Sequence, residues 1–494
     1  MRKHAFLLLI FSAYFSIIRA QSDPGINGAF PQGWYSETIS RDGRNMNCRI
    51  YYPAFSDGEN APADTISGPY PVVAFGHGFF MQTSYYISLY RRLTSHGFIV
   101  IAPQFSDTQH GELGRDLIYC LGFIQTSSST PGNRLYGIAD PSKKGVSGHS
   151  MGGGASLLAT TYDSTITIAA PLAAAETNPT IIGTIQNTRS YIYLISAQND
   201  GITPPATTQI PMYNNTPGNK GLLTIRGGNH TKFMDTGIFD FTDPNGYLSR
   251  TKQIYLSQKY LTAAFKLFLY EEKSYWKYVF GDSVAADTSV VIEKSVSTLP
   301  LAEYYITTPG GTYPDSAITL NWLRTSTLNP EEEIFYRAEL ALDSLFTQLF
   351  YVSAESQDSS VTIDSLPSGL YYFRVMARTI GGVVRFSSNT VNLIITPSTG
   401  ADESGVIPSQ FLLSSPYPNP FNPSFSVILT VPEAMRVRIR IADITGKEVY
   451  NESGILGAGR HEKSFRMDEF PSGIYFLMAE IKNQQFIRKL LLLK

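Results

Sequence analysis

Short apolar runs alternate with longer amphipathic segments between residue 21 and about residue 285. Continuous apolar runs bounded by turn residues are typical of strands buried on both faces, and apolar residues three or four apart predict helices. We therefore expect strands over residues 71–75, 98–102, 144–147, 167–170, 191–196 and 222–225. We expect helices over residues 84–96, 111–124, 153–159 and 251–270. This alternation predicts an α/β fold with a mostly parallel central sheet covered by helices on both faces.

The pattern changes in the second half of the chain, where strands are expected without helices. Residues 299–397 hold short alternating runs separated by turn residues, which predict an all-β domain. Trp322 on an early run and Tyr371 near the start of a later one resemble the arrangement in fibronectin type III sandwiches. This domain could act as a spacer or bind substrate. The polar residues 398–410 are expected to form a linker.

A third unit is expected over residues 411–494, as a second small β-sandwich. Four prolines within 415–423 exclude a helix or a central strand there, and alternating runs follow. The Pro-Asn-Pro-Phe-Asn-Pro opening, a Ser-Gly-Ile-Tyr segment and a Lys-Leu-Leu-Leu-Leu-Lys end together resemble a type IX secretion sorting domain. The resemblance implies export across an outer membrane and the secretion machinery as a partner, and the alternative is an ordinary β-sandwich.

The N-terminal residues predict an export signal over residues 1–20. Arg2 and Lys3 precede an apolar run over 5–18, and Ala20 provides a small residue for cleavage. A retained membrane anchor is the alternative. With this signal removed, residues 21–290 are the expected α/β domain, and the mature protein is expected to be secreted or held at the cell surface.

Composition excludes some partners and leaves the cysteines open. The chain has 39 basic and 41 acidic residues and a net charge of −2, so it offers no electrostatic basis for binding nucleic acid. Cys48 and Cys120 are its two cysteines, and they could pair after export or remain buried thiols. His, Cys and carboxylate residues are not clustered at a spacing that would predict a metal site. We also expect no cofactor, and we expect the protein to be a monomer.

The candidate nucleophile is Ser150, in the sequence Gly148-His149-Ser150-Met151-Gly152. This Gly-x-Ser-x-Gly pattern lies between a predicted strand and a predicted helix rich in small residues. Such a turn exposes a serine hydroxyl at the edge of a parallel sheet, and the small residues allow the turn to be tight. The alternative is a glycine turn with an unreactive serine.

Asp200 and His230 are the candidate acid and base. Asp200 follows the strand predicted over 191–196, and His230 follows the strand predicted over 222–225. Both therefore lie at the carboxyl edge of the sheet, and the chain order of serine, acid and histidine is that of α/β-hydrolases. As structural residues, the aspartate could cap a loop and the histidine could bond a carbonyl.

Two backbone N–H groups are expected to form an oxyanion hole. One belongs to Met151, directly after the serine, and the other to Phe79, in the loop after the strand at 71–75. His77 in this loop is expected to brace it, and His149 is expected to shape the pocket beside the serine.

Residues 70–235 resemble the cutinase-like polyester hydrolases and the dienelactone-hydrolase-type esterases. The matching segments are 71–79, 93–100, 145–154, 198–200 and 227–230. The resemblance implies an α/β-hydrolase fold and an acyl-enzyme esterase with an open cleft. It implies that Phe79 contacts substrate, that Met151 lines the cleft and that Ile202 forms an apolar wall.

Two departures from this family are visible. Ala175 takes the place of a tryptophan that usually clamps an aromatic acyl unit, so ring stacking is lost there. The family's C-terminal disulfide is also missing, since no cysteine follows Cys120. The sequence therefore predicts a secreted serine esterase, cutinase-like and acting on polyesters including poly(ethylene terephthalate). A general esterase or lipase on small esters or acylglycerols, and a non-catalytic surface binding protein, are the alternatives.

Overall fold

The computed structural model describes residues 23–296, 299–396, 411–414, 416, 418–482 and 484–493. The export signal expected over 1–20 and the linker expected over 398–410 lie outside these residues. The chain divides into two compact units, Met1–Leu299 with Leu328–Pro330, and Pro300–Thr327 with Glu331–Lys494.

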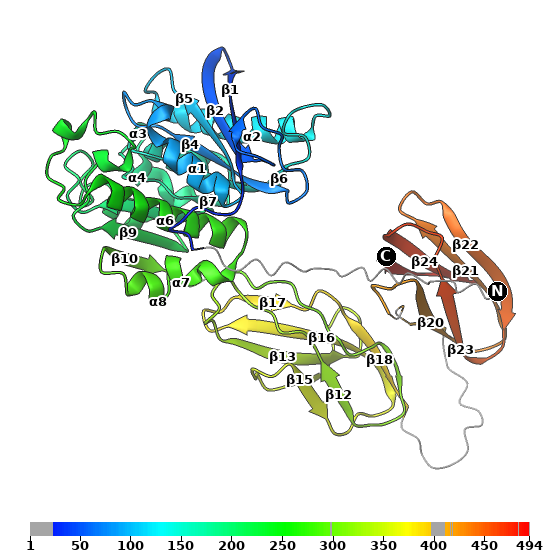
Figure 1. Ribbon diagram of the computed structural model, residues 1–494. Helices are drawn as coiled ribbons and strands as arrows, with labels where there is room; N and C mark the ends of the chain where they lie inside the picture. Colours follow the sequence, from blue (N-terminus) through cyan, green and yellow to red (C-terminus); the bar gives the residue numbers. More distant parts are fainter. Residues whose placement is uncertain are drawn as a thin grey trace, which may run out of the picture. The chain divides into compact units, whose positions relative to one another are not determined.

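A ten-stranded sheet forms the centre of the first unit (Figure 1), in the order β10-β9-β8-β7-β6-β4-β5-β2-β1-β3. Its strands are β1 (Gln32–Arg41), β2 (Arg44–Pro53), β3 (Gly58–Glu59), β4 (Tyr70–Gly76), β5 (Ile99–Gln104), β6 (Ala139–Gly148), β7 (Ile168–Ala169), β8 (Tyr191–Ala197), β9 (Lys220–Ile225) and β10 (Val290–Ser295). Neighbouring strands from β5 through β4, β6, β7 and β8 to β9 pair in parallel. The mostly parallel sheet of an α/β-hydrolase is thereby confirmed.

Helices cover both faces of this sheet. They are α1 (Ile87–Ser95), α2 (His110–Ser129), α3 (Met151–Tyr162), α4 (Ile181–Thr184), α5 (Gln209–Asn215), α6 (Arg250–Leu269), α7 (Trp276–Val279) and α8 (Asp282–Ala285). One buried cluster joins Leu93 of α1 and Phe265 of α6 to the sheet. A second cluster joins Leu117 of α2 and Leu157 of α3 to the opposite face. The sheet is therefore buried on both sides, which explains why its central strands are continuous apolar runs.

The edges of the sheet differ from the sequence-based expectation. The antiparallel pair β1 and β2 extends one edge, and β10 pairs antiparallel with β9 at the other. β1 and β10 carry many exposed polar residues, so their pattern does not stand out as a buried run. Because β10 ends at Ser295, the sheet also continues past residue 290.

Cys48 on β2 and Cys120 on α2 face one another in the second cluster. Their Sγ atoms are 4.0 Å apart and both side chains are fully buried. In the structure they are free thiols rather than a disulfide. Burial raises the pKa of the Cys120 thiol well above its usual range, which disfavours the reactive thiolate.

The N-terminal part of the second unit is all-β, as predicted. Its larger sheet has the order β11-β18-β16-β13-β14, with β17 paired to β16, and β12 pairs with β15. The strands are β11 (Gly311–Tyr313), β12 (Ile318–Asn321), β13 (Ile334–Ala341), β14 (Leu349–Val352), β15 (Ser360–Ile363), β16 (Gly369–Thr379), β17 (Val384–Phe386) and β18 (Val391–Ile395). Trp322 directly follows β12, and Trp322 and Tyr371 belong to the buried core. The fibronectin type III assignment stays a prediction.

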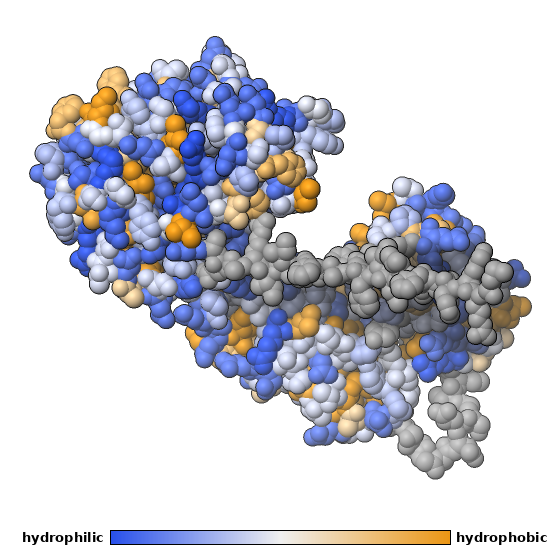
Figure 2. All heavy atoms as spheres, viewed as in Figure 1, coloured by the Kyte–Doolittle hydropathy of each residue, from blue (hydrophilic) through white to orange (hydrophobic). Residues whose placement is uncertain are grey.

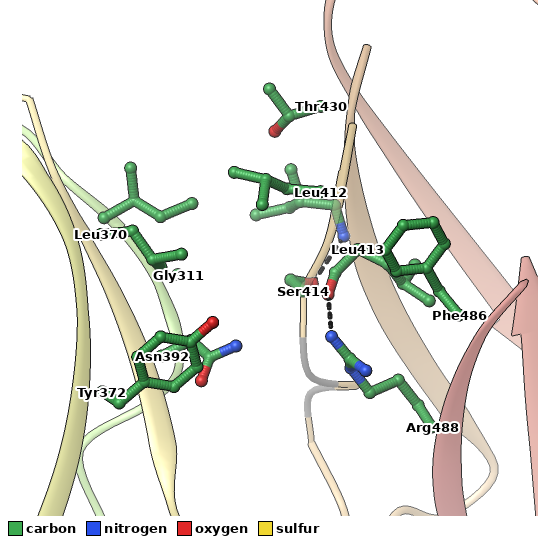
Figure 3. A pocket seen from close by; sticks show the side chains of 12 residues that line it. Gly311, Leu370, Tyr372, Asn392, Leu412, Leu413, Ser414, Thr430, Phe486 and Arg488 are labelled. Atoms are coloured by element: carbon green, nitrogen blue, oxygen red, sulfur yellow. Dashed lines mark hydrogen bonds between the residues drawn. The ribbon is translucent and has the colours of Figure 1, made fainter. Parts of the chain in front are cut away.

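The C-terminal part holds two antiparallel sheets, in the orders β19-β20-β23 and β22-β21-β24-β25. The strands are β19 (Leu412–Leu413), β20 (Ser424–Val431), β21 (Met435–Asp443), β22 (Glu448–Leu456), β23 (Gly459–Arg466), β24 (Gly473–Ile481) and β25 (Gln484–Leu492). Figure 3 shows Arg488 of β25 donating to the Leu413 carbonyl oxygen of β19, at 2.6 Å. A contact between β25 and β19 therefore links the two sheets.

The proline-rich opening of this part is fixed to the last strand. The Phe421 N–H donates to the Leu491 carbonyl oxygen at 2.9 Å, and the Leu493 N–H donates to that of Phe421 at 3.0 Å. The Asn419 side chain donates to the Lys489 carbonyl oxygen and accepts from the Leu491 N–H, both at 2.8 Å. Two of the segments that resemble a sorting domain are thus in direct contact.

On the face seen in Figure 2, hydrophobic residues form separate patches among hydrophilic ones. In the part of the chain that the structure describes, no helix is both long enough and apolar enough to cross a membrane.

Buried histidines predict a loss of stability in mild acid. Burial lowers the pKa of His96 from 6.5 to about 4, and it lowers that of His149 well below 6.5. Below about pH 6.5 the unfolded chain therefore binds protons that the folded chain does not, so stability present above that pH is lost as pH falls. We expect His96 alone to lower the free energy of unfolding by about 2 kcal/mol at pH 5.

This expectation is checked by thermal unfolding between pH 7 and pH 4. The His96 imidazole bonds the Ile26 carbonyl oxygen at 2.8 Å through Nε2. His96→Gln keeps a donor for that carbonyl and removes the titration, so its melting temperature should depend less on pH. Equal pH dependence in the two proteins would contradict the assignment to His96.

Candidate active site

Ser150 lies at a sharp turn between β6 and α3. Its φ is 55° and its ψ is −118°, and α3 begins at the next residue, Met151. This conformation is unfavourable for a residue with a Cβ atom, and the surrounding structure must hold it in place. The Ser150 N–H donates to the Leu172 carbonyl oxygen at 3.0 Å, and the Ser150 carbonyl accepts from the Ala175 N–H at 2.9 Å. A sharp turn between strand and helix is therefore present where the sequence predicts one.

The two glycines of the pattern allow the backbone to approach this closely. A Cβ atom on Gly152 would lie 2.2 Å from the carbonyl carbon and oxygen of Gly76 at the end of β4. A Cβ atom on Gly148 would lie 2.3 Å from the Gly152 carbonyl oxygen. Because the obstructing atoms belong to the backbone, only glycine fits at either position without moving β4 or α3.

Asp200 and His230 form a buried hydrogen-bonded pair. Asp200 follows β8 and His230 follows β9, as predicted from the sequence. The distance from His230 Nδ1 to Asp200 Oδ2 is 2.8 Å, and their exposed fractions are 1% and 4%. This bond fixes the imidazole with its Nδ1–H donating to the carboxylate, and it leaves Nε2 available as the basic nitrogen.

Further donors hold the Asp200 carboxylate. Its Oδ1 accepts from the backbone N–H groups of Ile202 and Thr203, at 2.9 and 2.7 Å. The Thr203 hydroxyl donates to Oδ2 at 2.9 Å. These bonds fix the orientation of the carboxylate toward the imidazole.

The hydrogen bond that would complete a triad is not formed. Within the described residues, the buried His230 Nε2 has no hydrogen-bond partner, the Ser150 hydroxyl included. Catalytic hydrogen bonds often shorten only when substrate binds. The structure therefore bonds Asp200 to His230 and leaves the buried Nε2 of His230 without a partner among the described residues.

The two N–H groups expected to form an oxyanion hole belong to the loop after β4 and to the start of α3. Neither Phe79 nor Met151 uses its N–H in a hydrogen bond to a loop or side chain of the described ranges. His77 is buried beneath this loop. Its Nδ1–H donates to the Gly78 carbonyl oxygen at 2.7 Å, and its Nε2 accepts from the Phe105 N–H at 2.9 Å. Its contacts are those of the bracing residue that the sequence suggests.

His149 has a different position from the one expected. Its side chain has no exposed surface, so it cannot contact a substrate. Its Nε2–H donates to the His230 carbonyl oxygen at 3.0 Å, and its Nδ1 accepts from the Tyr86 hydroxyl at 2.9 Å. The Tyr86 hydroxyl in turn accepts from the Gly78 N–H at 3.3 Å. His149 thus connects the loop after β4 to the loop that carries His230.

The remaining predicted substrate contacts differ in accessibility. Phe79 is 49% exposed and Ile202 is 45% exposed, so both can contact a substrate. Met151 is almost fully buried, at 4%, which leaves its backbone rather than its side chain for the site. Ala175 is partly exposed beside the elbow. Across the described ranges, no group of three or more His, Cys, Asp and Glu side chains could hold a metal ion.

Three residues that position the site were missed in the sequence. Thr203 and Tyr86 bond to it as described above, and the Asp243 carboxylate accepts from the His230 N–H at 2.6 Å. Thr203 lies three residues after Asp200, so an aspartate turn at this point could have indicated its contact with the carboxylate. Tyr86 and Asp243 carry no local signal, because their contacts depend on how separate loops pack.

Comparison with known proteins matches two parts of the chain to families. A family described as PET hydrolase-like matches residues 29–289. The chain belongs to the PET hydrolase-like family. A second match, over residues 415–493, is to the secretion system C-terminal sorting domain. The sorting domain expected over 411–494 is thereby confirmed, and it indicates export to the outer membrane or cell surface.

Relatives of the PET hydrolase-like part include several esterases. The bis(hydroxyethyl) terephthalate hydrolase of Streptomyces coelicolor is 29% identical over 174 residues, which cover 35% of this chain and 53% of that protein. Cutinase est1 of Thermobifida alba is 30% identical over 195 residues, 37% of this chain and 57% of its own. Cutinase 2 of Thermobifida cellulosilytica is 31% identical over 186 residues, 37% and 64% of the two chains. The chain spans a little over half the length of the first of these relatives.

Proposed function

We propose that this protein is an exported carboxylic ester hydrolase that acts on polyesters through a serine acyl-enzyme. The observation that carries the proposal is the buried Asp200–His230 pair, bonded at 2.8 Å, at the same edge of the sheet as the strained Ser150 elbow. Membership of the PET hydrolase-like family and the esterase relatives supply the substrate class.

In the proposed reaction, the Ser150 hydroxyl attacks the ester carbonyl while His230 Nε2 takes its proton. The negative oxygen that forms is stabilised by the N–H groups of Phe79 and Met151, and such donors typically contribute about 3 kcal/mol each. His230 then gives the proton to the leaving alcohol, which breaks the ester bond and leaves an acyl-serine. Water then attacks the acyl-serine while His230 takes a proton from it. His230 returns this proton to the Ser150 oxygen as the acid is released.

Asp200 keeps the imidazole in the correct orientation and stabilises its charged form. The three donors from Ile202 and Thr203 hold the carboxylate for this role. The bond from the Nδ1–H to Asp200 leaves Nε2 without a hydrogen-bond partner among the described residues. Only a neutral imidazole can accept the serine proton.

The choice between polymer and small ester rests on two opposed features. Phe79 and Ile202 expose apolar surface beside the catalytic groups, which suits a bulky, apolar substrate. Ala175 provides no ring at the position where polyester hydrolases usually stack an aromatic unit, which favours small soluble esters as the second candidate substrate.

The test compares two substrates with one preparation of the full exported chain. Hydrolysis of a soluble short-chain nitrophenyl ester is measured beside release of soluble products from an amorphous aromatic polyester film. Activity on both, lost in Ser150→Ala, is the expected result. Turnover of the soluble ester alone would assign a general esterase, and no reaction with either substrate or with a fluorophosphonate probe would contradict the proposal.

A further inference from the structure

The segment between His230 and α6 carries a buried carboxylate outside the triad. Asp243 is 1% exposed. Its Oδ2 accepts from the backbone N–H of His230 at 2.6 Å, and its Oδ1 accepts from the backbone N–H of Gly201 at 3.2 Å. Gly201 directly follows Asp200. One carboxylate therefore bridges the backbone of the proposed base and the residue after the proposed acid.

Apart from the side-chain bonds of His230 to Asp200 and Thr203, the two loops are tied at their strand-side ends. There the Asn199 N–H donates to the Gly228 carbonyl oxygen at 2.8 Å, and the Gly227 N–H donates to the Gln198 side chain at 2.9 Å. Asp243 ties the outer ends, where the reacting side chains lie. Its own backbone is held as well, because the Asn229 side chain donates to the Asp243 carbonyl oxygen at 2.5 Å.

The cost of burying this carboxylate indicates a positional role. Among the residues that the structure describes, no Lys, Arg or His side chain forms an ion pair with Asp243. A buried carboxylate without a cation is expensive unless hydrogen bonds compensate. Here the compensating donors are two backbone N–H groups from two different loops, so the charge is satisfied only while both loops keep their places.

The fit around Gly201 supports the same conclusion. A Cβ atom there would lie 3.0 Å from Asp243 Oδ1, closer than side chains normally approach. The absence of a side chain at this position therefore lets the carboxylate reach the backbone N–H. A methyl group at residue 201 would push the Asp243 carboxylate away from the Gly201 N–H. Removing the charge of Asp243 would weaken the same hydrogen bond.

We propose that Asp243 is a positioning residue that holds the Asp200 and His230 loops at the separation that catalysis requires. This inference rests on the proposed function. Asp243 does not contact substrate in this role, and it acts through the backbone of His230 and Gly201. Since small misplacements of catalytic groups can cost about 100-fold in rate, the effect should appear in kcat rather than in substrate binding.

The decisive variant is Asp243→Asn in the full chain. An asparagine keeps the shape but can accept only with its oxygen, so its NH2 group faces one of the two N–H donors. We expect kcat per titrated active site to fall about 10- to 100-fold with KM within about twofold. Asp235→Asn is the matched control, because Asp235 is exposed in the same segment and bonds the Ser88 N–H at 2.9 Å instead.

A proton NMR measurement separates positioning from general stability. The His230 Nδ1–H bonded to Asp200 should give a far-downfield resonance in the unmodified protein and in Asp235→Asn. This resonance should shift or broaden in Asp243→Asn and, to a smaller degree, in Gly201→Ala. The Gly201→Ala variant keeps the carboxylate, so it tests the bridge even where Asp243→Asn folds poorly.

The experiments separate failure of the esterase proposal from failure of the role proposed for Asp243. An unmodified protein that neither hydrolyses esters nor binds a fluorophosphonate would contradict the esterase proposal, and the NMR comparison would still test the bridge. Unchanged kcat per active site together with an unshifted resonance in both variants would overturn the role of Asp243. A lower melting temperature without either change would overturn it too, by reducing Asp243 to a structural residue.

Discussion

Ser150→Ala should lower kcat for a soluble nitrophenyl ester by a factor of about 10⁴ to 10⁶. The alanine removes the only atom that the proposed reaction uses as nucleophile, and the elbow backbone that holds residue 150 at a φ of 55° should stay in place. The His230–Asp200 pair then has no hydroxyl to deprotonate. Steady-state kinetics and mass spectrometry after fluorophosphonate treatment measure the effect, and the variant should gain no probe mass.

Ser156→Ala is the matched control for this substitution. Ser156 is a buried serine on α3, the helix that begins directly after Ser150. Its hydroxyl donates to the Gly153 carbonyl oxygen at 2.7 Å. Removing it deletes one local hydrogen bond and should leave kcat within a few-fold of the unmodified protein. Loss of less than 100-fold in Ser150→Ala, with probe still bound, would mean that another residue is the nucleophile.

Gly152→Ala should be the most destabilising single-methyl change in the elbow. The new Cβ atom would lie 2.2 Å from the Gly76 carbonyl group and 2.6 Å from the His77 carbonyl oxygen. Because these are backbone atoms, α3 must move away from β4, and this movement separates Met151 from the loop that carries Phe79. We expect a loss of about 4 kcal/mol or more in the free energy of unfolding, with activity lost in the fraction that still folds.

Gly122→Ala tests whether the effect comes from the crowding. Gly122 lies in α2, and a Cβ atom there would meet nothing within 4 Å. In a helix, alanine is favoured over glycine by up to about 1 kcal/mol, so this variant should be neutral or slightly more stable. Denaturant unfolding of the two variants makes the comparison, and similar losses in both would contradict the close-approach argument.

The central part of the fold and the positions of Ser150, Asp200 and His230 in it could be predicted from the sequence because both follow from local patterns. Buried parallel strands are continuous apolar runs, and β4, β5, β8 and β9 were placed to within a few residues. Ser150, Asp200 and His230 lie shortly after the ends of β6, β8 and β9. Once the sheet is parallel, that position alone brings them to one edge.

The residues that refine the site follow from packing between distant segments. His149 looks like a pocket residue because it neighbours Ser150, yet the strand-to-helix turn directs its side chain inward to Tyr86. Asp243 lies 13 residues after His230, and its role depends on the path of the intervening segment. The edge strands β1 and β10 were missed for a related reason, since exposed strands lack the apolar contrast that marks buried ones.

The contact between Asn419 and β25 ties the folding of the proline-rich opening to a strand that lies 70 residues later in the sequence. The side chain of Asn419 is bonded to the backbone of Lys489 and Leu491. The opening therefore cannot take its final structure until β25 is in place. A chain without β25 would carry the same opening sequence without its folded form.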